Sequence, residues 1–366
     1  MINKYYWWSV AFLLVFFLGS CKEDIDLSPD GKETAVVYAL LDQTDSIHYV
    51  RINRAFYGGT NALEIAQIPD SNYFKQVDAS ISELINGKVI RSWKLRDTTV
   101  FNKDSVGVFY APKQKLYYFK TDKVTTLKPG YTYKLNVSID NKRFEVNGEA
   151  KLIQNAKLGN PASEGNSFSF ASTNIAKYGY FSTQVNASLG SSAALNVALD
   201  IYVKEYKGAE SSIKKIKWNL GDRVGGNSST VAVGAGGESF YKKIASECTD
   251  KTVTKRQLYR VDINAMFCSS EFIEYLNSLL ASSSLAQSKK EYTNLTVSND
   301  MRVKGIFASR NNVIVQKLPF KQYSASNYFR AIDQSSMIEL CQGQYTGGLN
   351  FCSDVPSDFK ETYYCK

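Results

Sequence analysis

Histidine is almost absent from this chain: its 366 residues include one, at position 48. A zinc protease of the zincin type needs two histidines about one helical turn apart, and a hydrolase with a catalytic triad needs a histidine base. His48 precedes Val50 and Ile52 at the two-residue spacing of one face of a strand, and we interpret it as structural. The sequence therefore offers no candidate catalytic residue for these classes of enzyme.

Motifs that hold cofactors are missing as well. The chain has no Gly-x-Ser-x-Gly sequence and no phosphate-binding loop, and Gly234, Gly236 and Gly237 lack the third glycine of a dinucleotide fingerprint. It has no Cys-x-x-Cys pair of zinc ligands and no acidic calcium loop. The formal charge of +9 comes from lysines and arginines spread along the chain, which disfavours nucleic-acid binding. We expect no cofactor, no metal ion and no nucleic-acid partner.

The N-terminus has the layout of a bacterial signal peptide. Lys4 supplies a positive charge, Tyr5 to Leu18 form an apolar run of 14 residues, and Gly19 and Ser20 precede Cys21. This run is shorter than the roughly 20 residues that a transmembrane helix needs. Small residues directly before a cysteine resemble the lipobox of bacterial lipoproteins. The resemblance implies a signal peptide over residues 1–20 and a diacylglycerol or palmitate anchor on Cys21.

Charged residues follow this cysteine, at Lys22, Glu23 and Asp24. The run resembles the export signal that directs Bacteroidetes lipoproteins to the cell surface, and the alternative is a solvated charged tether, which any lipoprotein could carry. Residues 21–33 are predicted to be a flexible, acylated tether. The sequence thus predicts a lipid-anchored protein of the outer membrane, exposed at the cell surface.

Residues 34–153 have the pattern of a domain of short strands. A nearly continuous apolar run covers Thr34 to Leu41, and polar and apolar residues alternate from His48 to Arg54, so both segments are predicted strands. Asn86-Gly87 lies between two further strand patterns and is a strong hairpin signal, because both residues tolerate the positive φ of a type I′ turn. Asp140-Asn141 is predicted to turn a second hairpin.

A Pro129-Gly130 turn precedes a strand in which Tyr133 is followed by Leu135, Val137 and Ile139 at two-residue spacing. The segment resembles the tyrosine corner of fibronectin type III and immunoglobulin-like sandwiches, in which a buried ring sends its hydroxyl back to the backbone. The alternative is any antiparallel sheet with such a turn. We predict a mostly β fold that begins with an immunoglobulin-like β-sandwich.

A second β-rich domain is predicted after a linker. Residues 154–166 are rich in asparagine, glycine and serine and include a proline, which indicates a linker. Residues 167–366 are predicted to be an α+β domain, with its clearest strand from Leu195 to Val203. Further strands or hairpins are predicted at Tyr178–Val185, Ser212–Leu220, Gln257–Phe267 and Val303–Leu318. The glycine- and serine-rich segment Gly225–Gly237 is predicted to be a mobile loop.

Helical spacing is clear in one segment, where Phe272, Tyr275, Leu276, Leu279 and Leu280 fall on one face behind Ser269 or Ser270 as N-cap. Such an apolar stripe could dock a partner, but it more often packs on the protein's own sheet, so we predict core packing. A second short helix is predicted at Phe240–Glu247.

Six cysteines include Cys21, which leaves five in an exported chain, where disulfides persist. Cys341, Cys352 and Cys365 cluster near the C-terminus, and the pairs closest in sequence are Cys341 with Cys352 and Cys352 with Cys365. A disulfide is predicted to hold the C-terminal tail, with its connectivity left open.

Two stretches resemble an uncharacterised family of Bacteroidetes outer-membrane lipoproteins. The first reads VVYALLDQTDSIHYVRINRAFYGG and then IAQIPDSNYF, and the second reads SSEFIEYLNSLL followed by MRVKGIFASR. The cysteines of the tail are more widely spaced here than in many members, and the last tryptophan is Trp218. The resemblance implies an accessory protein, often associated with TonB-dependent transporters of the SusC type, and supplies no active-site residues.

These patterns leave two kinds of binding function open. One is a noncatalytic accessory role beside such a transporter, and the other is a stand-alone surface protein that binds a glycan or a peptide. Phe56, Tyr57, Tyr73 and Phe74 are candidates for a contact surface. We expect a binding protein and not an enzyme.

A carboxylate-dependent hydrolase is the remaining alternative, because glycoside hydrolysis needs only two suitably spaced acids. Asp42 with Asp45, and Glu271 with Glu274, are possible pairs. Nothing in the sequence distinguishes them from exposed loop and helix acids, so no catalytic pair is assigned.

Overall fold

The computed structural model of the protein describes residues 33–55, 64, 67–101, 110–111, 113–174, 178–225, 229–282, 292–298 and 301–366. Cys21, Lys22, Glu23 and Asp24 lie outside these residues, so the lipid anchor and the export signal stay predictions. The described chain is mostly β, with several sheets and three α-helices, which confirms the predicted fold class. None of its helices combines the length and the apolar character that a membrane crossing requires.

Twenty strands and three α-helices make up the described chain. The strands are β1 (Thr34–Asp42), β2 (Ile47–Ala55), β3 (Val77–Ile85), β4 (Lys88–Lys94), β5 (Arg96–Val100), β6 (Gln114–Lys120), β7 (Thr132–Ile139), β8 (Phe144–Lys151), β9 (Lys157–Leu158), β10 (Ala171–Ser172), β11 (Gly179–Tyr180), β12 (Ser182–Ser188), β13 (Ala194–Lys207), β14 (Glu210–Val224), β15 (Thr230–Gly236), β16 (Lys255–Cys268), β17 (Leu295–Val297), β18 (Arg302–Lys317), β19 (Phe320–Ser324) and β20 (Asn327–Arg330). The α-helices are α3 (Gly237–Glu247), α4 (Ser270–Ser282) and α5 (Gln334–Gln342), and short 3-10 helices cover Pro69–Asn72 and Pro356–Asp358.

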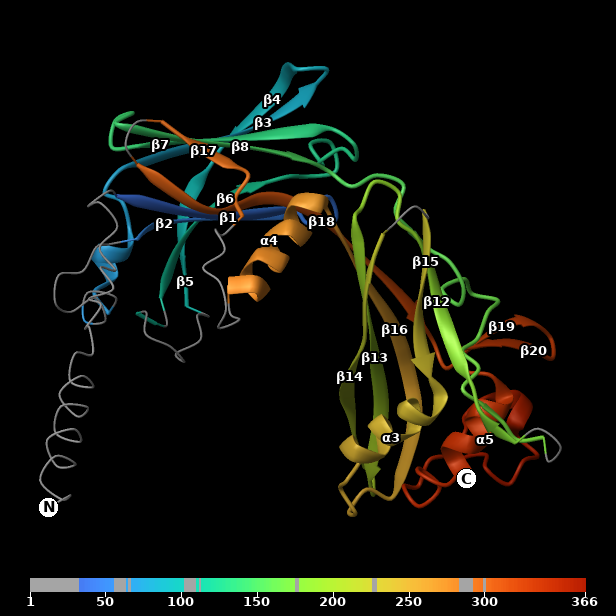
Figure 1. The fold of residues 1–366 in the computed structure, drawn as a ribbon. Helices are drawn as coiled ribbons and strands as arrows, with labels where there is room; N and C mark the ends of the chain where they lie inside the picture. The colour runs from blue at the N-terminus through green and yellow to red at the C-terminus, as the bar shows by residue number, and fades with distance from the viewer. Residues whose placement is uncertain are drawn as a thin grey trace, which may run out of the picture.

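The N-terminal unit is a sandwich of two sheets (Figure 1). Its first sheet has five strands in the order β17-β8-β7-β3-β4, and its second is one end of an eight-stranded sheet, in the order β18-β1-β2-β6-β5. Alternate side chains of these strands are buried, because successive residues of a strand point to opposite faces. The inward residues form one apolar core, which includes Val37, Ile52, Ile81, Leu135 and Phe307.

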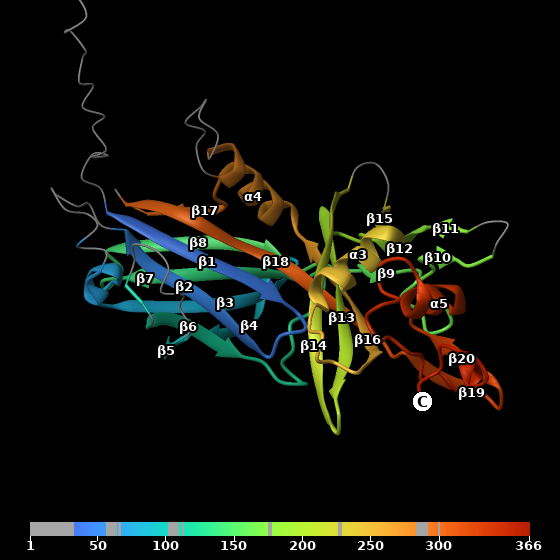
Figure 2. The same ribbon diagram turned by 90° about the horizontal axis from the view of Figure 1, so that it is seen from below.

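One long strand, β18, joins the sandwich to the second unit (Figure 2). Its first part, Arg302–Arg310, pairs in parallel with β1, and its last part, Arg310–Lys317, pairs antiparallel with β16. Within the range predicted to form a second domain, residues 295–310 therefore supply β17 and half of β18 to the sandwich. Periodicity identifies a strand but not its partners, so this return of the chain could not be predicted.

Both predicted hairpins are present. β3 and β4 are joined by Asn86 and Gly87, whose φ angles of 49° and 77° suit a type I′ turn. β7 and β8 are joined through a turn in which Asp140, Asn141 and Lys142 also have positive φ. Local turn chemistry therefore decides these two connections.

Tyr133 makes the hydroxyl contact that is predicted for a tyrosine corner. Its ring is fully buried, the backbone N–H of Lys128 donates to the hydroxyl oxygen at 2.7 Å, and the hydroxyl donates to Glu83 at 3.1 Å. Burial raises the pKa of Tyr133 far above its usual range, so the hydroxyl keeps its proton. The corner ties the start of β7 to the preceding turn and to β3. The two facing sheets are observed, and their relation to immunoglobulin-like folds stays a prediction.

The second unit is built on the other end of the eight-stranded sheet, in the order β14-β13-β16-β18. The three-stranded sheet β15-β12-β9 packs against it together with α3 and α5 (Figure 1). Their apolar side chains form a second core, separate from that of the sandwich, with Phe168, Phe240 and Phe267 among its largest members.

Two segments of this unit differ from the prediction. Residues 154–166, predicted to be a linker, contain β9, which pairs with β12. The described part of Gly225–Gly237, predicted to be a mobile loop, contains β15 and the first residue of α3, and Val233 and Ala235 are fully buried. Pairing with β12 and burial of these side chains override the low strand propensity of glycine and serine.

The predicted helices α3 and α4 are both present, and a third one, α5, was not predicted. In α3, Phe240 and Ile244 are buried in the second core. In α4, Tyr275 is buried against β18 but Leu276 is 37 % exposed, so the predicted core packing holds for part of the apolar stripe. α5 begins after Asp333, whose side chain accepts a hydrogen bond from a backbone N–H in the first turn.

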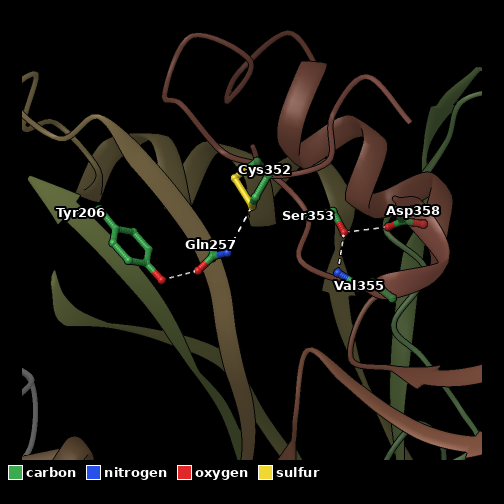
Figure 3. The surroundings of a disulfide bond; sticks show 7 residues. Tyr206, Gln257, Cys352, Ser353, Val355 and Asp358 are labelled. Carbon is green, nitrogen blue, oxygen red and sulfur yellow. Dashed lines mark hydrogen bonds between the residues drawn. A yellow bond between two sulfur atoms is a disulfide. The ribbon is translucent and has the colours of Figure 1, made fainter. Parts of the chain in front are cut away.

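A disulfide between Cys352 and Cys365 closes the C-terminal tail, and it is one of the two pairings closest in sequence (Figure 3). Gln257 of β16 donates to the Cys365 sulfur and accepts a hydrogen bond from the Tyr206 hydroxyl, so the bridge rests on the long sheet. The other described cysteines, Cys248, Cys268 and Cys341, are buried and free.

Two arginines, the buried Arg256 and the partly buried Arg330, add to this attachment of the tail. Arg256 of β16 is ion-paired with Glu205 at 2.8 Å and donates to the backbone carbonyl of Leu349 in the tail. Arg330 donates to both carboxylate oxygens of Asp358, which also accepts a hydrogen bond from a tail serine (Figure 3). The tail is therefore held by side chains that lie far from it in sequence.

Candidate functional site

The first of the two acid pairs proposed from the sequence supports the fold. The Asp42 side chain is fully buried and accepts hydrogen bonds from Thr44 and from the backbone and side chain of Asn312. Arg310 lies 3.6 Å from Asp42 and 3.9 Å from Asp45. Asp42 thus joins the turn between β1 and β2 to the point where β18 leaves the sandwich.

The second pair, Glu271 and Glu274, lies in the first two turns of α4. Glu274 is exposed to solvent and Glu271 is partly exposed. Acidic residues are favourable there because the N-terminal end of a helix carries a partial positive charge.

The aromatic residues proposed as a contact surface do not form one in the described chain. Phe56 and Tyr57 lie outside the described residues. Phe74 is buried in the sandwich core, and the hydroxyl of Tyr73 accepts a hydrogen bond from the backbone N–H of Lys115. The last two rings therefore support the fold.

His48 is a buried structural residue, as its strand spacing indicated. Its ring is 2 % exposed, it stacks on Phe119 with the ring centroids 4.6 Å apart, and its Nε2 lies 3.1 Å from Thr121 Oγ1. Burial lowers the pKa of His48 to about 4, so the ring is neutral at physiological pH. This neutral ring supports the aromatic wall of the pocket described below.

The structure brings together two acids that no sequence pattern pairs. Asp200 of β13 and Asp262 of β16 stand opposite each other in the antiparallel ladder and are 7 % and 4 % exposed. Lys215 binds Asp200 at 2.7 Å, and Arg260 lies 2.8 Å from Asp262 without an aligned hydrogen bond. Burial raises the pKa of Asp262. Because each carboxylate faces its own cation, we interpret the group as a set of ion pairs that stabilises the sheet.

A pocket of about 590 Å³ lies where the chain of the sandwich changes sheets. β4 pairs with β3 in the five-stranded sheet, whereas β5 pairs with β6 in the eight-stranded sheet. Leu95, between β4 and β5, is buried and donates its N–H to the Ala79 carbonyl at 2.9 Å. This anchor places the end of β4 and the start of β5 beside β6. The pocket is lined by Ser92, Trp93, Lys94, Leu95, Arg96, Tyr118, Phe119 and Lys120.

Aromatic rings form one wall of this pocket, which we name the sandwich pocket. The ring centroid of the half-buried Trp93 lies 5.2 Å from that of Phe119, which in turn stacks on His48. Tyr118 lines the same pocket, and Lys120 Nζ lies 6.0 Å from the centroid of its ring. Phe119 and His48 are buried, so Trp93 and Tyr118 are the partly exposed rings of the pocket that a ligand could contact.

The Trp93 ring is also contacted by Arg91, which is ion-paired with the buried Glu83. Arg91 Cζ lies 4.9 Å from the centroid of Trp93, and Arg91 Nε donates to the buried Glu83 at 2.8 Å. Glu83 also accepts the hydrogen bond from the Tyr133 hydroxyl. The tyrosine corner and the pocket therefore share one network, which holds the tryptophan in place before any ligand binds.

Three cations, Lys94, Arg96 and Lys120, line the sandwich pocket. Lys94 is ion-paired with Asp78 at 3.1 Å, but both side chains are mostly exposed and the pair is therefore weak. The lining that the structure describes includes no aspartate or glutamate. Three cations and no acid in its described lining favour an anionic ligand.

Two other pockets differ from the sandwich pocket in the charges of their lining residues. One of about 330 Å³ lies between α4 and the outer face of the sandwich, and it contains Asp45 together with Arg51 and Arg310. The other, of about 450 Å³, follows the end of β18, and its cations have partners within the protein. The sandwich pocket is therefore our candidate ligand site.

The sequence does carry a signal for this site, although none of the predictions above used it. Arg91, Trp93, Lys94 and Arg96 fall within six residues, so one tryptophan is surrounded by three cations. The other half of the pocket, on β6, becomes its neighbour only through the pairing of β5 with β6. Among the described residues, no three histidine, cysteine, aspartate or glutamate side chains are placed to hold a metal ion.

Comparisons with known proteins assign no family to this chain. No protein family and no curated protein matches its sequence. Among solved structures, the C-terminal globular domain of an oligosaccharyltransferase from Pyrococcus abyssi matches at 11 % identity with a TM-score of 0.17. The match covers 58 % of this chain and 42 % of that one, so it spans less than half of the other structure's length. A likeness at this TM-score supports no conclusion about fold or function.

Proposed function

We propose that this chain is a noncatalytic binding protein, lipid-anchored at the surface of the outer membrane, which holds an acidic saccharide beside a TonB-dependent transporter. The observation that carries the proposal is the sandwich pocket, which combines aromatic faces with three cations and has no acidic residue in its described lining.

An acidic saccharide suits both parts of this pocket. Its carboxylate or sulfate groups would bind Arg96 and Lys120 through charge-assisted hydrogen bonds, which are stronger than neutral ones. Its rings would lie against Trp93 and Tyr118. The volume of about 590 Å³ falls within the range of roughly 300–1,000 Å³ that is usual for small-ligand pockets.

The rigidity of the site also supports a role in binding. Trp93 lies on β4, which pairs with β3, and Tyr118 lies on β6, which pairs with β5, while Leu95 anchors the crossing from β4 to β5. Side chains that are already in place lose little conformational freedom when a ligand binds. The tyrosine corner and the two facing sheets further support an immunoglobulin-like sandwich as the scaffold.

Calorimetric titration of the acylated full chain in detergent tests the ligand. The probes are tetrasaccharides of galacturonic acid, a sulfated tetrasaccharide and a neutral tetrasaccharide. We expect the acidic probes to bind and the affinity to fall with added salt. The double variant Arg96→Ala with Lys120→Ala should bind about tenfold more weakly, because two ion pairs to the ligand are lost.

A matched double variant separates this site from general charge. Lys88→Ala with Lys134→Ala removes the same charge from exposed strand positions outside the pocket. Its affinity should stay within about twofold of the unchanged chain. Equal weakening by both double variants, or binding of the neutral probe as tightly as the acidic ones, would contradict the proposed ligand.

The anchor and the transporter have separate support and separate tests. Cys21 after two small residues supports lipidation, and the charged run after it supports export to the surface. Palmitate labelling should be lost in Cys21→Ser, and protease should digest the protein on intact cells.

The resemblance to transporter-associated lipoproteins supports the proposed transporter as partner. Failure to recover a TonB-dependent transporter with the tagged protein, in every mild detergent tried, would contradict that part.

A further inference from the structure

The last part of β18 has a partner strand on one side only. β1 accompanies β18 as far as Arg310, and β16 pairs with residues 310–317 on the opposite side. Among the strands that the structure describes, none pairs with the side of residues 311–317 that β1 has left. β18 then leads into the hairpin of β19 and β20 (Figures 1 and 2).

This open edge presents backbone hydrogen-bonding groups at every second residue. The backbone N–H of Asn312 points to the open side, since it donates to the Asp42 carboxylate at 3.1 Å. In an antiparallel strand the N–H and C=O groups of alternate residues point the same way, so those of Ile314 and Gln316 do too. Residues 313 and 315 point to β16 instead. The edge therefore offers two N–H and two C=O groups to an added strand.

The pocket of about 450 Å³ that follows this edge supplies apolar contacts. Ile314 and Leu318 line it and are 61 % and 53 % exposed. Phe329 of β20 lines it as well and stacks on Tyr323, with the ring centroids 4.1 Å apart. We name this pocket the edge groove. It combines an open strand edge with apolar side chains beside it.

The cations of the edge groove already have partners. Lys317 donates to two backbone carbonyls of the segment after β9. Lys321 is ion-paired with Glu164, and Arg330 is ion-paired with Asp358. Unlike the sandwich pocket, this groove has no excess of cations that would favour an anionic ligand.

We propose that the edge groove docks an extended peptide segment of another protein, which adds a strand beside β18. Main-chain hydrogen bonds to Ile314 and Gln316 supply affinity, and apolar side chains at alternate positions contact Ile314, Leu318 and Phe329. Residues 312 to 316 extend about 13 Å at roughly 3.3 Å per residue, which accommodates a segment of about five residues. The site is separate from the sandwich pocket, and either one can be correct without the other.

The walls of the groove argue against a second copy of this chain as the occupant. Residues of the hairpin and of the segment 162–164 line the groove beside the edge. In a symmetric contact the same surface of both copies meets, so the groove walls of both copies would have to fit together as well as the two edges. A single extended strand carries no such walls.

Selection from a library of random 12-residue peptides, displayed on phage and captured by the full chain, tests the proposal. The recovered peptides are titrated against the unchanged chain, Gln316→Pro and Gln316→Thr. Proline removes the N–H that points to the open side and leaves the ladder with β16 intact, because residues 315 and 317 make that ladder. Threonine keeps the N–H. We expect apolar residues at alternate positions, equal binding to Gln316→Thr, and binding about tenfold weaker to Gln316→Pro.

Hydrogen exchange of the unchanged chain gives a second readout that needs no variant. The amides of Ile314 and Gln316 should exchange quickly in the free chain and slowly with a selected peptide, while those of 313 and 315 are slow in both. Recovery of no peptide, peptides that bind Gln316→Pro as tightly as the unchanged chain, or peptides that leave these two amides unprotected would each overturn the proposal. So would sedimentation that shows a dimer which Gln316→Pro converts to monomers.

Discussion

The cations that line the sandwich pocket differ in their surroundings from the buried cations of the second unit. In the second unit, buried cations are matched within the protein, as Arg256 is by Glu205. In the sandwich pocket, Arg96 and Lys120 line a cavity whose described lining has no carboxylate. Matched, buried charges fix a structure because leaving one of them alone is costly, whereas exposed and unmatched charges remain available to a ligand. The comparison separates cations that stabilise the fold from cations that are exposed to solvent in a pocket.

The units also differ in how their ends are secured. The sandwich uses short-range devices, the hairpin turns and the Tyr133 corner. The second unit uses side-chain contacts around its C-terminal tail, namely the Cys352–Cys365 disulfide and the hydrogen bonds and ion pairs of Arg256 and Arg330. After removal of the predicted signal peptide, Trp93 and Trp218 are the only tryptophans, one in each unit. Single-tryptophan chains, made with Trp218→Phe or Trp93→Phe, can therefore report the two units separately.

The largest effect is expected from Arg256→Met. It should lower the free energy of unfolding of the second unit by about 3–5 kcal/mol, because the largely buried Glu205 would lose its partner and the Leu349 and Asp250 carbonyls their donor. Urea denaturation followed by Trp218 fluorescence measures the loss. Lys242→Met, which breaks the exposed pair with Glu238, serves as control and should change the free energy of unfolding far less, because solvent screens an exposed pair. If both variants lost the same free energy of unfolding, buried and exposed ion pairs would not differ in their contribution to stability.

Removal of the disulfide should have the next largest effect. Cys352→Ser with Cys365→Ser is expected to destabilise the second unit by about 3 kcal/mol, since the bridge closes a loop with a sequence separation of 13. Limited proteolysis should cut the tail faster, while Trp93 fluorescence should report an unchanged sandwich. The Cys248 thiol shows whether the core of the second unit stays folded. Burial raises the pKa of this thiol to about 11, so thiol reagents should attack it slowly as long as the core is intact. A tail that resists protease after both substitutions would show that the arginines alone hold it.

The sandwich should lose stability in acid through His48. Burial lowers the pKa of this ring to about 4 in the folded chain, against about 6.5 when unfolded, so protonation favours the unfolded chain. Its contribution is therefore complete above pH 6.5 and is lost as the pH falls toward 4, by about 2–3 kcal/mol. Urea denaturation at several pH values, followed by Trp93 fluorescence, should show this slope in the unchanged chain and a flatter one in His48→Gln. If stability depended on pH in the same way in both chains, protonation of carboxylates and not of His48 would be the cause of the loss in acid.

The smallest effect is expected at the tyrosine corner. Tyr133→Phe should cost the sandwich about 1–2 kcal/mol, because the N–H of Lys128 loses its acceptor and Glu83 loses a donor. Tyr131→Phe is the matched control, since this partly buried ring lies two residues away and its hydroxyl makes neither contact, and it should change stability by less than about 0.5 kcal/mol. If Tyr133→Phe also weakened binding of the acidic probe, the shared network with Arg91 and Trp93 would be the reason.

Much of the fold followed from local patterns, and the exceptions have physical reasons. The hairpin at Asn86-Gly87 and the strand from Leu195 to Val203 could be predicted, because turn chemistry and alternation are written in neighbouring residues. Gly225–Gly237 was misread as a loop, since its composition suits a loop and only pairing with β12 buries Val233. The tail could be expected to carry a disulfide, but spacing could not choose its partners.

The candidate site was harder to predict than the fold. The acids proposed from sequence, Asp42 among them, serve the structure, while Asp200 and Asp262 meet only through the register of β13 and β16. The sandwich pocket joins the segment around Trp93 to Tyr118, which is distant in sequence. Register and sheet order arise from burial summed over many residues, and a short segment does not carry that information.

By itself, the sequence determined the mostly β character of this protein, its hairpin turns, the tyrosine corner and the scarcity of histidine. Each of these depends on a residue and its near neighbours. The tertiary structure alone decided that β18 serves both units, that its last residues keep an open edge, and that three cations surround an aromatic wall. Those features depend on which distant segments share a sheet, and that choice is made by burying the two apolar cores as a whole.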